Sequence, residues 1–237
     1  MKDNFVIGVL GMGTYATILM FRQYAEIFEA EKEWDRPRIV IDNRCTMPSR
    51  VRAFLYNENV EQLLSEMIES LDYLVNAGCT HIVLACNTAH LFLPMILERR
   101  PEFSDKILNI VDNCVKRIVE DGKKQVYLIG TEGTVASKVY QSKLSVYDID
   151  CLTPEEDEYS KMRFCIEAVK QNKFDDEVKK TFLELVNRTD TCILGCTELP
   201  VLFEKYGDEV TCGTVYDPMR MAVERLKEIY SERGGRL

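Results

Sequence analysis

The stretch VIGVLGMGTYAT at residues 6–17 sets the fold, because a short apolar run leads directly into glycines and small residues. This order is typical of a buried strand that ends in a tight turn and opens a helix. Residues 126–137 read VYLIGTEGTVAS and repeat the apolar run, the Gly-Thr pair and the small residues. Thr134 follows Thr14 by 120 positions. A strand–turn–helix unit that occurs twice indicates a duplicated α/β architecture.

A second pair of stretches repeats across the chain and places one cysteine in each half. HIVLACNTAH at residues 81–90 resembles TCILGCTELP at residues 191–200, and each has a cysteine after an apolar run with a threonine close behind. Cys196 follows Cys86 by 110 positions, close to the spacing of the first pair. Because the carboxyl ends of parallel strands form the ligand-binding edge of a sheet, we expect both cysteines at a shared cleft.

Apolar, β-branched runs alternate with longer amphipathic stretches along the chain, as is typical of parallel strands covered by helices. We expect strands at residues 5–10, 38–41, 81–85, 107–111, 125–129, 146–151 and 191–195, and helices at about 17–33, 60–77, 115–121, 157–171, 175–187 and 218–233. The sequence therefore predicts two similar doubly wound parallel-sheet α/β subdomains, related by pseudo-twofold symmetry, with the active site in the cleft between them. Turn-rich segments place residues 1–114 in the first subdomain and residues 115–212 in the second.

Composition and charge exclude several classes of protein. The 237 residues are 46% hydrophobic, which is ample for conventional buried cores. The formal net charge is −9, with Lys and Arg spread along the chain, which argues against a nucleic-acid partner. No apolar run approaches the ~20 residues of a membrane span, and the first residues lack the basic start and cleavage site of a signal peptide. We therefore expect a cytoplasmic protein without a membrane partner.

The chain has nine cysteines, no Cys-x-x-Cys pair and only two histidines, which favours reduced thiols over disulfides or zinc. A free cysteine is most often inert packing, and this is what we expect of Cys45, Cys79, Cys114, Cys151, Cys165, Cys192 and Cys212. Cys86 and Cys196 differ, because each lies between a strand and a polar pair that opens a helix. At such a place the helix dipole can lower a thiol pKa from ~8.5 by one or more units.

Five pieces of the sequence together resemble the aspartate/glutamate racemase superfamily, specifically its aspartate-racemase-like branch. They are GVLGMGTYAT at 8–17, IDNRCTMPSR at 41–50, ACNTAH at 85–90, IEAVKQN at 166–172 and LGCTELP at 194–200. The resemblance implies two similar α/β subdomains with the active site between them, and a C-terminal segment, residues 213–237, that returns to the first. It also implies a homodimer, as is common among similar racemases.

The resemblance assigns roles to particular residues. The family's paired catalytic cysteines correspond to Cys86 and Cys196. Its arginine for the substrate carboxylate corresponds to Arg50, and the lysine of its VK segment corresponds to Lys170. The family often has Asp just before that arginine, and this chain departs from the pattern with Ser49, which bears on the substrate range.

Inverting an α-carbon without a cofactor requires a base on one face and an acid on the other, and two cysteines supply an interchangeable thiolate and thiol. The two cations favour a dicarboxylic amino acid, aspartate or glutamate, as the small-molecule partner. We expect neither pyridoxal phosphate nor a metal. Candidates to surround the α-carboxylate, or simply to cap helices, are Thr14, Asn87, Thr88 and Thr197. Glu198 is expected to orient Thr197 or the substrate ammonium, or to favour a helix N-terminus.

Other functions remain open at this point. Hydantoin racemases, maleate isomerases and decarboxylases of the same superfamily use similar cysteines. Gly11, Gly13 and Ala16 form a G-x-G-x-x-A pattern with Asp42 at the end of the second strand, as in a nicotinamide-binding oxidoreductase. A non-catalytic amino-acid sensor would keep the two cations and need neither thiol. For His90 we expect capping or packing rather than catalysis.

Overall fold

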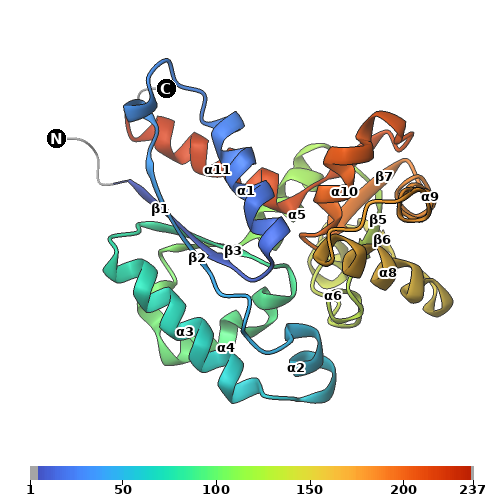
Figure 1. The fold of residues 1–237 in the computed structure, drawn as a ribbon, viewed down its shortest axis with the longest axis horizontal. Coiled ribbons are helices and arrows are strands. Elements are labelled where there is room, and N and C mark those ends of the chain that lie inside the picture. The colour runs from blue at the N-terminus through green and yellow to red at the C-terminus, as the bar shows by residue number, and fades with distance from the viewer. Residues whose placement is uncertain (1–4, 236–237) are drawn as a thin grey trace.

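The computed structural model describes residues 5–235, which form two parallel sheets with helices on their faces (Figure 1). The first sheet has the strand order β2-β1-β3-β4 and the second has the order β6-β5-β7-β8. The strands are β1 (Val6–Gly11), β2 (Arg38–Asn43), β3 (His81–Ala85), β4 (Ile107–Leu108), β5 (Gln125–Gly130), β6 (Asp150–Leu152), β7 (Thr191–Gly195) and β8 (Thr214–Tyr216). The predicted α/β class with two similar parallel sheets is confirmed.

The helices follow the strands in a regular alternation, and several begin at a side-chain cap. Thr131, Asn109, Asp175 and Asp217 each accept a backbone N–H at the start of a helix. The α-helices are α1 (Thr14–Ile27), α2 (Arg50–Tyr56), α3 (Val60–Asn76), α4 (Leu93–Arg99), α5 (Ile110–Glu120), α6 (Glu132–Ala136), α7 (Gln141–Ser145), α8 (Tyr159–Lys170), α9 (Asp176–Val186), α10 (Leu199–Tyr206) and α11 (Pro218–Glu232). Short 3₁₀ turns lie at Glu33–Asp35, Thr88–Phe92, Pro101–Phe103, Glu156–Glu158 and Gly207–Glu209.

The first sheet is buried on both faces, as a parallel sheet requires. Ile7 and Val9 on one face pack in a core with α1, α5 and α11, whereas Leu10 on the other face packs with α3 and α4 (Figure 1). In the second sheet, Leu128 on one face joins the same core as Ile7, and Leu194 on the other packs with α8, α9 and α10. One continuous apolar core therefore extends from the first sheet to the second.

Some elements differ from the sequence prediction for local reasons. The fourth strand stops at Leu108 instead of Val111, because the Asn109 side chain caps the next helix. The sixth strand starts at Asp150 instead of Val146, because α7 and a turn with Asp148 at φ 55° occupy the intervening residues. The first helix is displaced toward the N-terminus and ends at Ile27. The short strand β8 and the short helices α2, α4, α6, α7 and α10 were not predicted.

The C-terminal segment connects the two sheets. Thr214–Tyr216 pairs with β7 in the second sheet, and α11 then packs on α5 and α1. The division of the chain into residues 1–114, residues 115–212 and the returning segment 213–237 stays a prediction.

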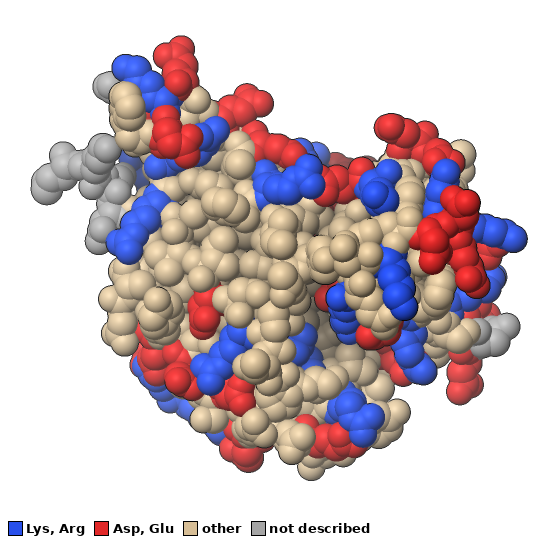
Figure 2. All heavy atoms as spheres, viewed as in Figure 1, with Lys and Arg blue, Asp and Glu red and all other residues tan. Residues whose placement is uncertain are grey.

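On the face shown in Figure 2, basic and acidic groups are interspersed along the edge, and further basic groups lie in the lower middle beside a hollow, separated by uncharged surface. This face therefore lacks the continuous basic patch that a nucleic-acid backbone would require. Within residues 5–235, no helix combines the length and the apolar character needed to cross a bilayer.

Candidate active site

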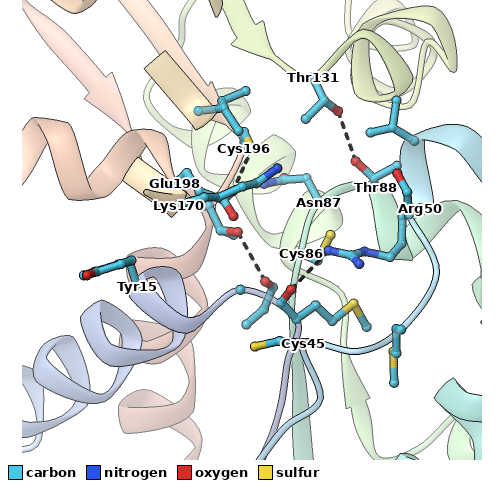
Figure 3. A pocket seen from close by; sticks show the side chains of 18 of the residues that line it. Tyr15, Cys45, Arg50, Cys86, Asn87, Thr88, Thr131, Lys170, Cys196 and Glu198 are labelled. Atoms are coloured by element: carbon cyan, nitrogen blue, oxygen red, sulfur yellow. Dashed lines mark hydrogen bonds between the residues drawn. The ribbon is translucent and has the colours of Figure 1, made fainter. Parts of the chain in front are cut away.

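A pocket of about 400 Å³ lies where strand ends of both sheets meet, and it contains every site residue that the sequence predicted (Figure 3). The first half of the chain contributes the ends of β1 and β3 and the start of α2. The second half contributes the ends of β5 and β7 and one side of α8. The predicted residues that line it are Cys86, Cys196, Thr14, Arg50, Asn87, Thr88, Lys170, Thr197 and Glu198. The other lining residues include Gly13, Tyr15, Cys45, Met47, Ser49 and Thr131.

Cys86 follows the last residue of β3, and its thiol is partly accessible. Its backbone carbonyl accepts a 2.9 Å hydrogen bond from Nδ1 of buried His90, and His90 Nε2 accepts one from the Ile110 N–H. Burial lowers the pKa of His90 to about 4, so its ring is neutral at neutral pH. His90 therefore fixes the turn that carries Cys86 by pairing two backbone groups.

Cys196 follows the last residue of β7 and is only 7% exposed. Its Sγ donates a 2.9 Å hydrogen bond to Oε2 of Glu198, which is also 7% exposed. Burial, and then the charge of Glu198, raise the pKa of the Cys196 thiol well above its usual value. The two pocket thiols thus have different surroundings, although the sequence repeat makes them equivalent in position.

Arg50 is the first residue of α2, whose N-terminus is capped by Ser49. Its guanidinium reaches toward Cys86 (Figure 3) and donates to the backbone carbonyls of Met12 at 3.2 Å and Pro48 at 3.3 Å. Burial by itself would lower the pKa of Arg50, but electrostatic interaction with Cys86 and Glu198 raises that pKa overall. The buried Nε finds no hydrogen-bond partner within residues 5–235. A charged donor is therefore held at the pocket with one N–H still available.

Asn87 and Thr88 connect the first half of the chain to the second. The Tyr140 hydroxyl donates a 2.6 Å hydrogen bond to Asn87 Oδ1, while Asn87 Nδ2 has no partner among the described residues. Thr88 Oγ1 lies 3.1 Å from Oγ1 of Thr131 and 3.1 Å from Oγ1 of Thr134. Because a buried amide N–H without a partner costs free energy, Asn87 Nδ2 is suited to an acceptor supplied by a ligand.

Lys170 lies at the C-terminal end of α8, and its Nζ donates a 2.7 Å hydrogen bond to Glu167 Oε1. Burial would lower the pKa of Lys170, whereas the bond to Glu167 and the charges of Glu198 and Cys196 raise it overall. A second cation therefore lines the pocket, and an acidic neighbour holds it.

Two threonines of the predicted set make contacts within the protein. Thr197 Oγ1 donates to the backbone carbonyl of Ala85 at 3.2 Å, which joins the strand end of β3 to the turn after β7. Thr14 Oγ1 lies 3.2 Å from Sγ of exposed Cys45. Both hydroxyls line the pocket.

The sequence analysis missed several residues that build the pocket. Thr131 and Thr134 belong to the second copy of the repeated turn, so comparing the copies position by position would have found them. Cys45 was expected to be inert packing, yet it is exposed and lines the pocket. Tyr140, which orients Asn87, carries no sequence signal, because its helix is short and its partner lies 53 positions away.

The glycine-rich turn after β1 faces a carboxylate. A Cβ on Gly13 would lie 2.8 Å from Glu198 Oε1, so the missing side chain makes room for that group. A buried carboxylate at the start of α1 would repel a dinucleotide pyrophosphate, which needs the helix N-terminus for itself. The geometry therefore argues against a nicotinamide site at this turn.

A comparison with models of protein families matches residues 9–226 to the family described as Asp/Glu/Hydantoin racemase. Among curated proteins, the chain is 27% identical over 173 residues to "Glutamate racemase" of Aquifex aeolicus, covering 70% of this chain and 65% of that protein. It is 25% identical over 214 residues to "Broad specificity amino-acid racemase RacX" of Bacillus subtilis, covering 86% of this chain and 90% of that one. The match thus spans slightly less than two thirds of the glutamate racemase and most of the broad-specificity protein.

Among solved structures, "Picrophilus torridus aspartate racemase" superposes with a TM-score of 0.80 at 27% identity. The superposition covers 98% of this chain and 96% of that one. The fold therefore agrees over nearly the whole length of both proteins.

Proposed function

This chain belongs to the Asp/Glu/Hydantoin racemase family, and from that premise we propose that it interconverts L- and D-aspartate, with glutamate as the second candidate. The reaction would use Cys86 and Cys196 as acid and base, without pyridoxal phosphate or a metal. The observation that carries the proposal is that two thiols, from equivalent positions after β3 and β7, line one pocket together with two cations.

The chemistry follows from the positions of these thiols. As a thiolate, one cysteine removes the α-proton, and the electron pair left on carbon is delocalised into the α-carboxylate. The thiol of the other cysteine then delivers its proton to the opposite face and becomes the thiolate. A positioned acid or base of this kind contributes typically 10²–10⁴-fold to a rate. Two of them are required because one group does not reach both faces of the carbon.

Recognition of the substrate would fall to the donors that have no partner in the free protein. Arg50 Nε and Asn87 Nδ2 are buried at the pocket and suit the oxygens of one carboxylate. Lys170, on the opposite half of the chain, suits a second carboxylate. Two cations on different walls favour a dicarboxylic amino acid over a neutral one.

The test of this function is a reaction in deuterated water. L-Aspartate should gain α-deuterium and D-aspartate should appear, and both signals should disappear in Cys86→Ala and Cys196→Ala. Cys151→Ala is the matched control, because Cys151 is partly accessible and lies outside the pocket. Exchange that persists in both single pocket variants would contradict the proposal.

The substrate range is tested by a panel of amino acids, with the enantiomers separated by chiral chromatography. Turnover of aspartate or glutamate above neutral amino acids is the expected result, and turnover of hydantoins would indicate the third chemistry in the family's name. A homodimer and a cytoplasmic location remain predictions, and sedimentation and cell fractionation check them.

A further inference from the structure

The two pocket thiols lie beside groups of opposite charge. The Arg50 guanidinium points toward Cys86 (Figure 3). Cys196 is hydrogen-bonded at 2.9 Å to the carboxylate of Glu198. A cation stabilises a thiolate and an anion stabilises a protonated thiol. The free protein therefore favours a protonated thiol at Cys196.

Several charged or titratable groups lie around Cys196. The charged or titratable groups that act on it are Glu198, Cys86, Arg50 and Lys170. Glu198 makes the direct contact, whereas Lys170 is hydrogen-bonded to Glu167 and Arg50 is hydrogen-bonded to the backbone carbonyls of Met12 and Pro48. Glu198 is thus the group through which the proton of Cys196 can move over a single hydrogen bond.

Gly13 leaves the space that the Glu198 carboxylate occupies. Gly13 has φ −150° and ψ 125°, an extended conformation that any residue adopts, so backbone freedom does not explain a glycine there. A Cβ at that position would lie 2.8 Å from Glu198 Oε1. The glycine of the first turn therefore leaves the space in which Glu198 stands against Cys196.

We propose that Glu198 is a positioning residue that passes a proton between Cys196 and water, so that Cys196 is restored to its thiol form between turnovers. This inference rests on the proposed two-cysteine function and deepens it. It replaces the expectation that Glu198 orients Thr197 or the substrate ammonium.

In the return step, the proton that Cys196 gave to the substrate is replaced from water. After one turnover that began with the Cys86 thiolate, Cys86 holds the α-proton and Cys196 is a thiolate beside an anionic Glu198. Water protonates the Glu198 carboxylate, and the new O–H bond breaks as the proton forms an S–H bond on Cys196. Cys86 returns its own proton to water, so that the protein ends with the proton count with which it began. The form in which the Cys196 thiolate lies beside the Glu198 carboxylate is unfavourable, because two buried anions are adjacent. This unfavourable contact drives the return of the proton to Cys196.

Kinetic constants for the two directions do not identify the role of Glu198 by themselves. Racemisation has an equilibrium constant of one, so kcat/KM for the two enantiomers must change equally in any variant. The decisive measurement is therefore made on the free protein. Iodoacetamide alkylates thiolates, and mass spectrometry assigns the modified cysteine at each pH.

In the wild type, the partly accessible Cys86 should be alkylated more readily than the buried Cys196, which should resist until the solution is alkaline. In Glu198→Gln, alkylation of Cys196 at neutral pH should rise at least about tenfold, because loss of the neighbouring carboxylate charge favours the thiolate. Gly13→Ala should also raise the alkylation of Cys196, because the added Cβ displaces the Glu198 carboxylate without removing it. The matched control is Glu158→Gln, which removes another buried glutamate that does not line the pocket.

Turnover supplies the second readout. Glu198→Gln should lower kcat for aspartate by about 10²-fold while KM changes little. An unchanged alkylation profile for Cys196 in both variants would overturn the inference, and so would a rise in KM with kcat retained, since that pattern belongs to a substrate ligand. A wild-type protein that shows the thiol profile but exchanges no α-proton would refute the proposed function instead.

Discussion

Tyr140 donates a 2.6 Å hydrogen bond from its hydroxyl to Oδ1 of Asn87, and the two residues belong to different repeats of the chain. The bond fixes which end of the amide faces the pocket. Asn87 Nδ2 is thereby left for a ligand.

Removal of this hydroxyl tests the arrangement. Tyr140→Phe should lower the free energy of unfolding by about 1–3 kcal/mol, because Asn87 Oδ1 is left buried without a donor. Racemisation should weaken mainly through KM for aspartate. Tyr127→Phe is the matched control, because the buried Tyr127 hydroxyl meets no partner within residues 5–235, and its loss should be nearly neutral. Equal effects of the two substitutions in urea denaturation would contradict the assignment.

Activity should fall when Arg50 is replaced, even by a residue of the same charge. Arg50→Lys removes the Nε donor and the planar fork, so kcat/KM for aspartate should fall about 10- to 100-fold, as expected for one lost charge-assisted hydrogen bond. Steady-state kinetics measures this loss. Arg52→Lys, on the same helix but paired with Glu58 at the surface, should keep wild-type activity. Retained activity in Arg50→Lys would show that a point charge at this place is sufficient.

Glu167 pairs with Lys170, the cation that the proposed function assigns to a substrate carboxylate. Glu167→Gln frees the ammonium, and KM for aspartate should fall by roughly two- to fivefold, since an exposed ion pair contributes up to about 1 kcal/mol. Initial rates at low substrate concentration report the change. Glu184→Gln breaks a similar exposed pair with Lys161 outside the pocket and should leave KM unaltered. A KM that rises in Glu167→Gln would mean that the glutamate positions the lysine instead of restraining it.

His90 should make the protein less stable in mild acid. Its pKa is lowered to about 4 in the folded state, so between pH 6.5 and pH 4 the unfolded chain binds the extra proton. Stability is therefore complete above pH 6.5 and is lost as the pH falls. At pH 5 this histidine should account for a loss of about 2 kcal/mol relative to pH 7. Urea denaturation of wild type and His90→Asn at both pH values isolates the contribution, which should vanish in the variant.

Much of the architecture could be predicted from the sequence, because the patterns that indicate strands and long helices are local. An apolar run before a glycine-rich turn predicts a strand end, and the long amphipathic stretches predict helices such as α3. The short elements could not be predicted, because the three residues of β8 and the five residues of α6 are too few to show a periodic pattern of apolar residues. Their positions depend on partners elsewhere in the chain.

The candidate site was likewise predicted only in part from the sequence. Residues within the repeated strand ends, such as Cys86 and Cys196, were found because position after a parallel strand carries information about ligands. Their unequal charge environments were not found, because Arg50 comes from a helix 36 positions before Cys86. Folding brings them together, and only the three-dimensional contacts reveal the asymmetry.

The apolar core that joins Leu128 of β5 with Ile7 of β1 has a consequence for how this duplicated chain melts. Because residues of both halves form one core, neither half should fold as a separate fragment. Heating should give one calorimetric peak, and a chain severed between α5 and β5 should regain structure only when both pieces are mixed.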